Sequence, residues 1–425
     1  MAGETQALRT IFDAVVAAAH PADILAPHLP KAPAGRVIIL GAGKAGASMA
    51  AAAVAFYRSK GVEDARLVGI AVARDGYGCD AGPIAVVEAG HPLPNAAGLD
   101  ATRTVLELAR SAGPDDLVLA LISGGGSANW LLPRGDITLA DKQAVTKALL
   151  RSGAGIGEIN CVRKHLSEIK GGRLAVACGD ARLVTLAISD VPGDDPSVIA
   201  SGPTVPDPTT LQDALEIVRR RGIALPENCR RVLEDAASET PKPGDAVFAG
   251  RPYTIVSTPA SAIAAGVAAA EALGYAVQML GTDLEGEARD VAREHAALAL
   301  DAKRRGERVA IISGGELTVT ISGEGRGGPN QEYALALALA LDGEPGIAAL
   351  SADTDGTDGG TGLATDPAGA FAGPETLAQA RAAGIDPAAA LKDNDSTGFF
   401  TAIGGLFVPG PTLTNVNDCR VILVG

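Results

Sequence analysis

Three short glycine-rich segments, each following an apolar run, constrain the fold of this chain more than any other feature. They are GAGKAG (Gly41 to Gly46), SGGGS (Ser123 to Ser127) and SGGE (Ser313 to Glu316). An apolar run that ends in such a turn is typical of a buried strand leading into a helix. Glycine there lets the backbone approach a ligand, and the helix start offers N–H groups to an anion. The three turns predict α/β units that handle phosphate groups.

Apolar runs of strand length alternate with helical patterns along the whole chain. The expected strands cover 36–40, 67–73, 84–88, 117–122, 183–188, 253–256, 276–280, 309–312, 347–350 and 420–424. The expected helices lie near 43–58, 97–112, 138–152, 157–169, 260–273, 286–304, 330–341 and 374–383. This alternation predicts an α/β fold built on mostly parallel sheets flanked by helices.

Length and a break in the pattern divide the chain in two. A chain of 425 residues is most simply two domains. Residues 238–250 (SETPKPGDAVFAG) combine proline, glycine and charge without periodicity. We expect this stretch to be a linker or hinge between an N-terminal Rossmann-like domain over 1–240 and a C-terminal α/β domain over 241–425.

Charge and composition limit the possible partners. The net charge of −14 argues against nucleic acid or an anionic membrane surface as a partner. No apolar run approaches the roughly 20 residues that span a bilayer, and the N-terminal residues resemble an amphipathic helix rather than a signal peptide. The five cysteines lack metal-ligand spacing and predict reduced thiols. We expect a cytoplasmic protein, monomer or homodimer, that concentrates its cations where an anionic substrate binds.

The first turn admits two interpretations. Gly41, Gly43 and Gly46 match the Gly-x-Gly-x-x-Gly pattern, which alone would indicate a nicotinamide-dependent oxidoreductase. However, Lys44 stands at the start of the helix, where its charge opposes the helix dipole unless an anion is bound beside it. Asp75 is only a loose match to the expected ribose-binding acid. A lysine here suits a transferring phosphoryl group, so we favour phosphate binding over a structural turn or a nicotinamide site.

Further donors and cations lie at and after the second turn. Three consecutive glycines exceed what a tight turn requires, so a ligand is favoured beside Ser123, Gly124, Gly125, Gly126 and Ser127. In the segment 159–175 (INCVRKHLSEIKGGRLA), Arg163, Ser167 and Lys170 are spaced to share one helix face. Such a face could hold a carboxylate or phosphates, and a solvated helix surface is the alternative.

Carboxylates follow two of the expected strands. Asp190 comes after the strand at 183–188, where α/β sheets place their sites, and could accept a hydroxyl proton or bind Mg²⁺. Asp353, Asp355 and Asp358 lie within six residues and would repel one another unless solvated or metal-bound. We favour a hard cation on one or two of these three, with nucleotide phosphates completing its shell. Ordinary turns rich in Asp and Gly are the alternative for Asp190.

The second half contributes one more cationic position. Gly315 and Glu316 end a strand, and Arg326 lies in a glycine-rich loop just before a helix that opens at Asn330. A guanidinium in such a loop fits a bidentate clamp for phosphate or carboxylate.

Taken together, these segments resemble the glycerate 2-kinase family, whose C-terminal part is called the MOFRL domain and whose members were formerly named hydroxypyruvate reductases. The shared segments, in order, are ILGAGKA, GHPLPN, SGGGSA, NxVRKHLSxxKGGRLA, SDVPGDDPSVIASGPTVPD, GGE, GRGGPNQE, DGTDG, NDSTGFF and GPTLTNVND. The resemblance spans essentially the whole chain. It implies two α/β domains with the active site in the cleft between them, and ATP-dependent phosphorylation of D-glycerate to 2-phosphoglycerate.

The resemblance also implies roles for particular residues. Functional positions of the family map onto Lys44 and Arg326, and its acidic loops map onto Asp190 and Asp355. Two departures concern substrate preference. Pro329 stands where a second arginine is usual, and Asn129-Trp130 replaces a shorter apolar step.

The resulting hypothesis has phosphates of Mg·ATP along the glycine-rich turns, with Lys44 and Arg326 at the transferring group. Asp190 orients or deprotonates the 2-hydroxyl, and Asp353 and Asp355 hold Mg²⁺ or another divalent cation. Further substrate and phosphate contacts are expected from Gly43, Ser123, Gly124, Gly125, Gly126, Ser127, Arg163, Lys170, Gly315, Glu316 and Asn330. The alternatives are an NAD(P)H-dependent hydroxypyruvate reductase, for which no convincing histidine–arginine pair can be assembled, and a sugar-phosphate-binding regulator.

Overall fold

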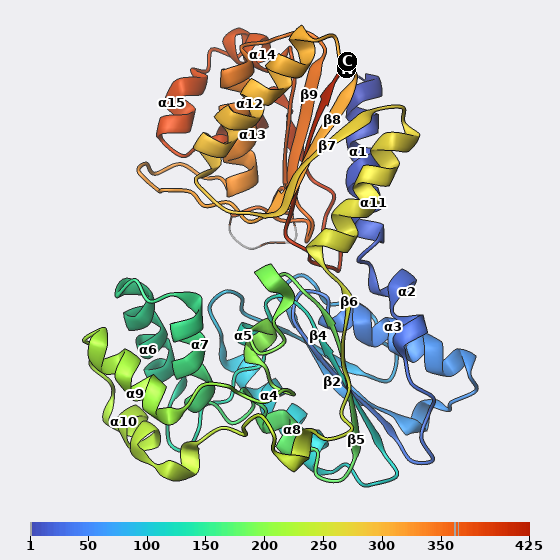
Figure 1. Cartoon of the computed structure of the whole chain (residues 1–425), viewed down its shortest axis with the longest axis vertical. Coiled ribbons are helices and arrows are strands. Elements are labelled where there is room, and N and C mark those ends of the chain that lie inside the picture. The colour runs from blue at the N-terminus through green and yellow to red at the C-terminus, as the bar shows by residue number, and fades with distance from the viewer. Residues whose placement is uncertain (1, 361–362, 364) are drawn as a thin grey trace. The chain divides into compact units, whose positions relative to one another are not determined.

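The computed structural model describes residues 2–360, 363 and 365–425, which form two compact units (Figure 1). The central unit is Ile24–Val256. The terminal unit combines the chain up to Asp23 with Ser257–Gly425. The two-domain α/β architecture expected from the sequence is therefore present, and each unit is built around a six-stranded sheet.

Helices and strands alternate in the central unit. Its elements are β1 (Val37–Ala42), α3 (Gly46–Ser59), β2 (Leu67–Arg74), β3 (Ala85–Ala89), α4 (Ala96–Arg110), β4 (Leu117–Ile122), α5 (Gly126–Asn129), α6 (Leu139–Arg151), α7 (Ile156–His165), α8 (Arg173–Ala177), β5 (Arg182–Ile188), α9 (Leu211–Arg220), α10 (Glu227–Glu234) and β6 (Tyr253–Ser257). A short helix, α2 (Pro21–Ile24), stands at the junction of the units.

The terminal unit begins with the N-terminal helix and resumes after β6. Its elements are α1 (Ala2–Ala17), α11 (Pro259–Ala272), β7 (Ala276–Leu284), α12 (Ala288–Arg304), β8 (Val309–Gly315), α13 (Pro329–Leu341), β9 (Ile347–Asp353), β10 (Gly369–Ala372), α14 (Thr376–Ala382), α15 (Pro387–Lys392), α16 (Ser396–Ile403), β11 (Leu406–Phe407) and β12 (Asp418–Val424).

The division of the chain differs from the expected 1–240 and 241–425 in two places. Helix α1 packs on α11 and on strands β9 and β12, burying an apolar stripe that includes Leu8, Ile11 and Val15. At the other boundary, β6 lies beside β5 in the central sheet. Residues 238–250 are also no linker, because they belong to the central unit, where Thr240 Oγ1 donates to Asp207 Oδ2 at 3.0 Å.

The central sheet has the strand order β3-β2-β1-β4-β5-β6, and the registered pairs from β3 to β5 are parallel. The chain moves outward from β1 in one direction and from β4 in the other. Ligands of open α/β sheets bind at such a reversal point, beyond the carboxyl ends of the strands. The turns after β1 and β4 are GAGKAG and SGGGS.

The terminal sheet has the order β11-β10-β9-β12-β8-β7. The sequence predicts a mostly parallel sheet here, but the observed sheet is mostly antiparallel. Only β7 and β8 pair in parallel among its neighbours, while β12 is antiparallel to both β8 and β9. Among the described residues, no helix lies between the neighbouring strands β9 and β10, which pair antiparallel. A parallel pair would require a crossover connection, usually a helix.

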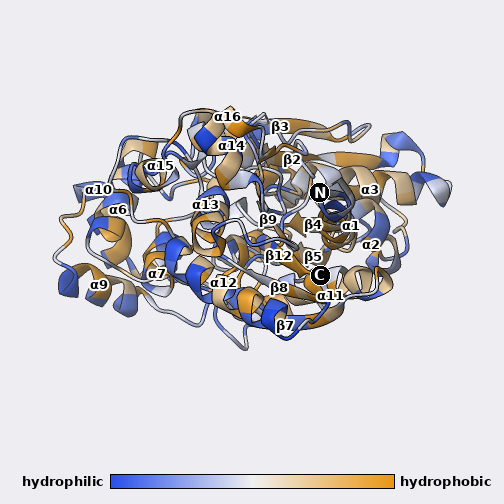
Figure 2. Cartoon of the chain, turned by 90° about the horizontal axis from the view of Figure 1, so that it is seen from above, coloured by the Kyte–Doolittle hydropathy of each residue, from blue (hydrophilic) through white to orange (hydrophobic). Residues whose placement is uncertain are grey.

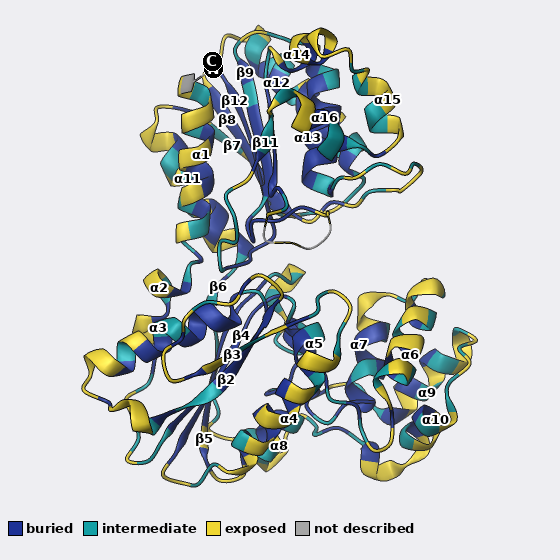
Figure 3. Cartoon of the chain, turned by 180° about the vertical axis from the view of Figure 1, so that it is seen from behind, coloured by how far each residue is buried: buried dark blue, intermediate teal, exposed yellow. Residues whose placement is uncertain are grey.

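Apolar strands covered by helices form the cores of both units. Strands β4 and β12 are buried at every residue (Figure 3) and are mainly hydrophobic (Figure 2). In the terminal unit, α1 and α11 cover one sheet face and α12 and α13 the other (Figure 1). Helices α6, α7, α9 and α10 form a separate apolar cluster in the central unit. Among the described residues, no helix is both long and apolar enough to cross a membrane.

Candidate active site

The GAGKAG and SGGGS turns form one hydrogen-bonded structure at the carboxyl ends of β1 and β4. Lys44 N donates to Gly124 O at 2.8 Å, and Ala45 N donates to Ser123 Oγ at 2.8 Å. Gly43 has a φ of 101°, and a Cβ there would lie 2.4 Å from Ser123 O. Only glycine therefore allows the two turns to approach this closely.

The two turns differ in what their backbone N–H groups can do. In GAGKAG, the N–H groups from Gly43 to Gly46 are all bonded inside the protein, to Val72 O, Gly124 O, Ser123 Oγ and Gly43 O. In SGGGS, the N–H groups of Gly124, Gly125 and Ser127 have no hydrogen-bond acceptor within the described part of the chain. A concave run of unbonded N–H groups favours an anion. The second turn is therefore the better phosphate cradle.

Lys44 lies against the second turn. It is half-buried, and a Cβ on Gly125 would be 3.5 Å from Lys44 Cγ and 3.1 Å from His91 Cδ2. A side chain on Gly125 would therefore crowd both residues. The side chain of Lys44 therefore lies beside the unbonded N–H groups of the second turn.

Lys170 holds the SGGGS turn in place through two hydrogen bonds to backbone carbonyls. Lys170 Nζ donates to Ser127 O at 2.8 Å and to Trp130 O at 2.9 Å. Burial lowers the pKa of Lys170 well below its ordinary value. Because its ammonium is occupied by backbone carbonyls, we assign Lys170 to positioning the turn rather than to contacting a ligand.

Ser201 is a residue that the sequence analysis missed. Its Oγ lies 2.8 Å from Ser127 Oγ and donates to Asn160 Oδ1 at 3.2 Å. Ala200 and Ser201 have φ of 49° and 60°, a left-handed conformation that non-glycine residues rarely adopt. Such strain is concentrated at functional sites. The ASGP segment carried the only sequence signal, and its strain is not visible in the residue types.

The expected helix over 157–169 is shorter in the structure. Helix α7 ends at His165, so Arg163, Ser167 and Lys170 do not share one helix face. Gly171 and Gly172 then leave the helical path, and their N–H groups donate to Ser201 O and Gly202 O. Arg163 is half-buried, and burial lowers the pKa of its guanidinium.

Asp190 follows the end of β5, the strand beside β4 in the sheet. It is half-buried, and the preceding Ser189 closes a local turn by accepting from Val191 N at 3.2 Å. Asp190 therefore stands on the same sheet edge as the SGGGS turn.

In the terminal unit, the start of α13 already holds a carboxylate. Asp358 accepts from Asn330 N at 3.0 Å and from Gln331 N at 2.8 Å. Asn330 Nδ2 also donates to Asp418 Oδ1 at 2.7 Å, and its Oδ1 accepts from Ser351 Oγ. Burial raises the pKa of Asp358 to about 7. The predicted anion contact at Asn330 is thus embedded in an internal polar network.

The other two aspartates of the DTDGTD segment shape its turn. Asp353 Oδ1 accepts from Asp355 N at 2.8 Å, and Asp355 Oδ1 accepts from Thr357 N at 2.7 Å. Within the described ranges, no group of three or more His, Cys, Asp or Glu side chains is arranged to hold a metal ion.

The remaining predicted positions lie on two loops of the terminal unit. Gly315 has a φ of 103° and ends β8, and Glu316 is exposed with its N–H bonded to Leu284 O. Arg326 is exposed, and its backbone is fixed by Asp395 Oδ1 and by Thr397 N. The loop backbone is thus anchored while the guanidinium faces solvent.

Family models match both parts of the chain. A domain of unknown function, DUF4147, matches residues 7–234, and the MOFRL family matches residues 309–418.

Curated relatives match nearly the whole chain. A protein of Agrobacterium vitis, provisionally named a hydroxypyruvate reductase, is 52% identical and covers 99% of this chain and 94% of its own. The D-glycerate 2-kinase of Thermotoga maritima is 40% identical, covering 93% of this chain and 92% of its own. The glycerate 2-kinase of Pyrococcus horikoshii is also 40% identical, covering 92% and 88%.

A solved structure shows the same fold. The crystal structure of glycerate kinase from Thermotoga maritima aligns with a TM-score of 0.87 and 36% identity, covering all of both chains. These matches agree with the ten sequence motifs and with the two-unit α/β architecture. The chain therefore belongs to the glycerate 2-kinase family, with a MOFRL region in its C-terminal part.

Proposed function

We propose that this chain transfers the γ-phosphoryl group of ATP to the 2-hydroxyl of D-glycerate, giving 2-phospho-D-glycerate. The observation that carries the proposal is the near full-length similarity to two glycerate 2-kinases at 40% identity. The open N–H groups of the SGGGS turn, with Lys44 beside them, support it because phosphoryl transfer depends on stabilising charge.

The chain's own residues can share the chemistry as follows. The N–H groups of Gly124, Gly125 and Ser127 bind phosphate oxygens, and Lys44 stabilises the charge of the transferring group. Arg326 supplies a second cation whose guanidinium fork can clamp phosphate or carboxylate. Arg163 is the candidate for the glycerate carboxylate.

Asp190 is the proposed base. It accepts the proton of the 2-hydroxyl as the hydroxyl oxygen bonds to phosphorus and the bond to the ADP oxygen breaks. Its place on the edge beside the SGGGS turn supports this role. The hydrogen bond between Ser127 Oγ and Ser201 Oγ holds the SGGGS turn in position for this step.

Asp353 and Asp355 are the proposed ligands of Mg²⁺. Their carboxylate oxygens are hard donors of the kind that this cation prefers, and the turn holds them two residues apart. When bound, the cation would neutralise charge on the nucleotide phosphates. Two carboxylates suffice in principle, because phosphates and water complete its shell.

The free state of the five cysteines supports a reducing, cytoplasmic setting for the reaction.

One assay tests the proposal and its alternative together. The name of the Agrobacterium vitis relative favours a hydroxypyruvate reductase as the second candidate. Purified protein is given D-glycerate with Mg·ATP, or hydroxypyruvate with NAD(P)H. We expect ADP release and a phosphorus NMR signal from 2-phosphoglycerate. NAD(P)H oxidation without ADP release would reverse the order of the two functions, and a 3-phosphoglycerate signal would refute the site of transfer.

A further inference from the structure

The glycine-rich loop that carries Arg326 lies against the segment that begins α16. This segment, NDST (394–397), is part of the NDSTGFF motif and contains none of the residues proposed for the reaction. A Cβ on Gly325 would overlap Asp395, and a Cβ on Gly327 would overlap Ser396. The close approach of the two segments therefore requires glycine on both sides of Arg326.

Both backbone polar groups of Arg326 are bonded to the NDST segment. Arg326 N donates to Asp395 Oδ1 at 3.2 Å, and Arg326 O accepts from Thr397 N at 2.8 Å. The neighbouring glycines would otherwise allow the backbone a wide range of conformations. The two hydrogen bonds therefore fix the backbone from which the side chain of Arg326 extends.

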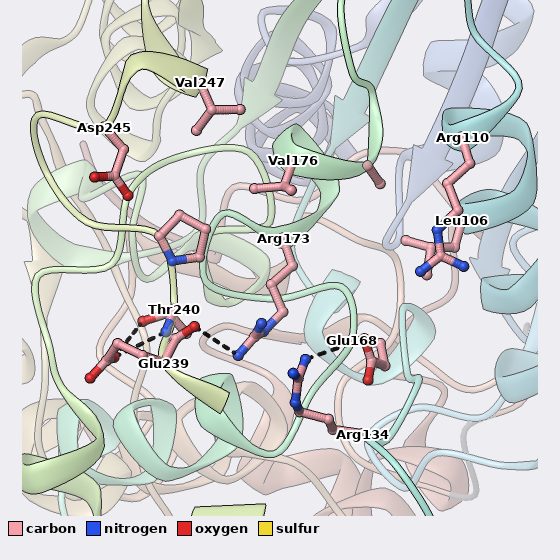
Figure 4. A pocket seen from close by; sticks show the side chains of 12 residues that line it. Leu106, Arg110, Arg134, Glu168, Arg173, Val176, Glu239, Thr240, Asp245 and Val247 are labelled. Carbon is pink, nitrogen blue, oxygen red and sulfur yellow. Dashed lines mark hydrogen bonds and ion pairs between the residues drawn. The ribbon is translucent and has the colours of Figure 1, made fainter. Parts of the chain in front are cut away.

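The guanidinium of Arg326 is exposed, and no hydrogen bond or ion pair links it to the described part of the chain. The arginines that line a cavity of about 740 Å³ in the central unit differ in this respect (Figure 4). There, Arg134 forms an ion pair with Glu168 at 3.5 Å. Arg173 Nη2 donates to Ser238 O at 2.6 Å. Those guanidinium groups hold the fold together, whereas that of Arg326 is available to a ligand.

The NDST segment is itself tied to the start of α13. Thr397 Oγ1 donates to Gln331 Oε1 at 2.7 Å. One residue further along α13, Glu332 Oε2 accepts from Asn394 Nδ2 at 2.9 Å. Gln331 and Glu332 are both buried. The segment can therefore act as a firm support for the loop, because it is bonded to the interior of the terminal unit.

We propose that Asp395 and Thr397 are positioning residues, which hold Arg326 so that its guanidinium meets an anionic group of the substrates. The inference rests on the proposed phosphoryl transfer, in which Arg326 supplies a cation. A guanidinium fork binds phosphate or carboxylate through two parallel hydrogen bonds, so its contribution depends on its orientation. The two positioning residues act through Arg326 and need no contact with a substrate.

Steady-state kinetics with D-glycerate and Mg·ATP compare Asp395 with a matched aspartate. Asp395→Ala removes the acceptor of Arg326 N and should lower kcat/KM about tenfold, because a misplaced cation stabilises the transition state less. Asp395→Asn keeps an acceptor oxygen and should restore most of the rate. Asp386→Ala is the control, because Asp386 caps α15 as Asp395 caps α16. It should leave kcat/KM unchanged.

The Arg326→Ala background separates positioning from a general structural effect. If Asp395 acts through Arg326, Asp395→Ala should cause no further loss in this background. A loss that persists there would overturn the proposal, as would normal kcat/KM in either Asp395→Ala or Arg326→Ala. If the wild-type protein releases no ADP, the proposed function itself is refuted, and this role with it.

A second pair of variants decides the question if Asp395→Ala does not fold. Thr397→Val removes the hydroxyl that donates to Gln331 but keeps the shape of the side chain. We expect it to lower kcat/KM about threefold, the equivalent of one weak hydrogen bond, and only when Arg326 is present. Thr401→Val is the control on the same helix, because the Thr401 hydroxyl donates to Thr397 O instead. Equal rates in the two threonine variants would then overturn the proposal.

Discussion

The SGGGS turn of the central unit and the GRGGPN loop of the terminal unit both lead into a helix and both present backbone N–H groups at its start. At SGGGS, three of these groups have no partner within the described residues. At the start of α13, the corresponding groups of Asn330 and Gln331 are taken by the buried carboxylate of Asp358. Both helix starts suit an acidic group, but in the second the protein supplies one, the buried carboxyl group of Asp358.

This difference separates two ways of binding a charged substrate. The central unit can use its backbone, together with Lys44, as the phosphate site. At its GRGGPN loop the terminal unit offers a side chain, because the N–H groups of Asn330 and Gln331 at the helix start are already bonded. The exposed guanidinium of Arg326 is that side chain. Substitutions at four positions, Lys44, Arg326, Asp358 and Ser201, test this comparison.

Replacing Lys44 by alanine should have the largest effect. Turnover should fall about a thousandfold, because a cation at the transferring phosphoryl group is removed. The melting temperature should change little, since Lys44 is not part of the apolar core. Coupled-enzyme kinetics and thermal melting measure the two effects. Lys60→Ala, beyond the other end of α3, is the matched control, and near-normal turnover in Lys44→Ala would exclude this lysine from the mechanism.

Arg326→Ala should reduce turnover about a hundredfold, and Arg326→Lys should recover only part of the loss because the fork is missing. Arg293→Ala, at an exposed arginine that forms an ion pair with Asp290, serves as the control. Steady-state kinetics of the double variant Lys44→Ala/Arg326→Ala extend the test. If the two cations serve one step, its loss is smaller than the product of the single losses. Fully multiplicative losses would separate their roles.

Asp358 should make stability depend on pH. Burial raises its pKa to about 7 in the folded state, whereas an unfolded aspartate titrates near pH 4. Between these values only the folded protein holds the proton, so stability falls as pH rises and levels off above about 7. From about pH 5.5 to about 8.5 this group alone accounts for a loss of about 2 kcal/mol.

Urea unfolding at several pH values checks this dependence. Asp358→Asn carries no titrating group, so its curve should be flatter than that of the wild type over the same range. Parallel curves for the two proteins would show that the internal carboxylate does not change its protonation on folding.

Ser201→Ala should have the smallest effect. Losing the contacts with Ser127 and Asn160 should slow turnover about tenfold and cost about 1 kcal/mol of stability. Ser201→Gly removes the same hydroxyl but accepts the positive φ more easily, so it should be more stable than Ser201→Ala and equally slow. A fully active Ser201→Ala enzyme would make the hydroxyl dispensable. Kinetics and melting curves together separate these cases.

The sequence predicted the strands well because strand cores are apolar and bounded by glycine turns. Each of the ten expected strands is present, whereas β10 and β11 were missed, being short and without a distinctive apolar run. The pairing direction of the terminal sheet could not be predicted. It depends on how the last strand, β12, inserts between β8 and β9, which no local pattern encodes.

The sequence motifs predicted which segments form the candidate site, but not the hydrogen bonds within it. Glycine-rich turns mark Lys44 and Ser127, but sequence cannot show which N–H groups remain unbonded after folding. It also cannot show that Asp358 fills the start of α13, because the three aspartates of that loop look equivalent in the chain. Likewise, the sequence predicts a ligand contact at Lys170, because the two carbonyls that accept from its Nζ come together only in the fold.

The membership of α1 in the terminal unit has a consequence for synthesis on the ribosome. Its apolar residues pack against partners made more than two hundred residues later, with Phe12 stacked edge-on against Phe407 at 5.0 Å. The central unit can fold while the apolar face of α1 is still exposed to solvent. The first segment to emerge is thus among the last to be sheltered, and nascent chains stalled before residue 257 should be the most dependent on chaperones.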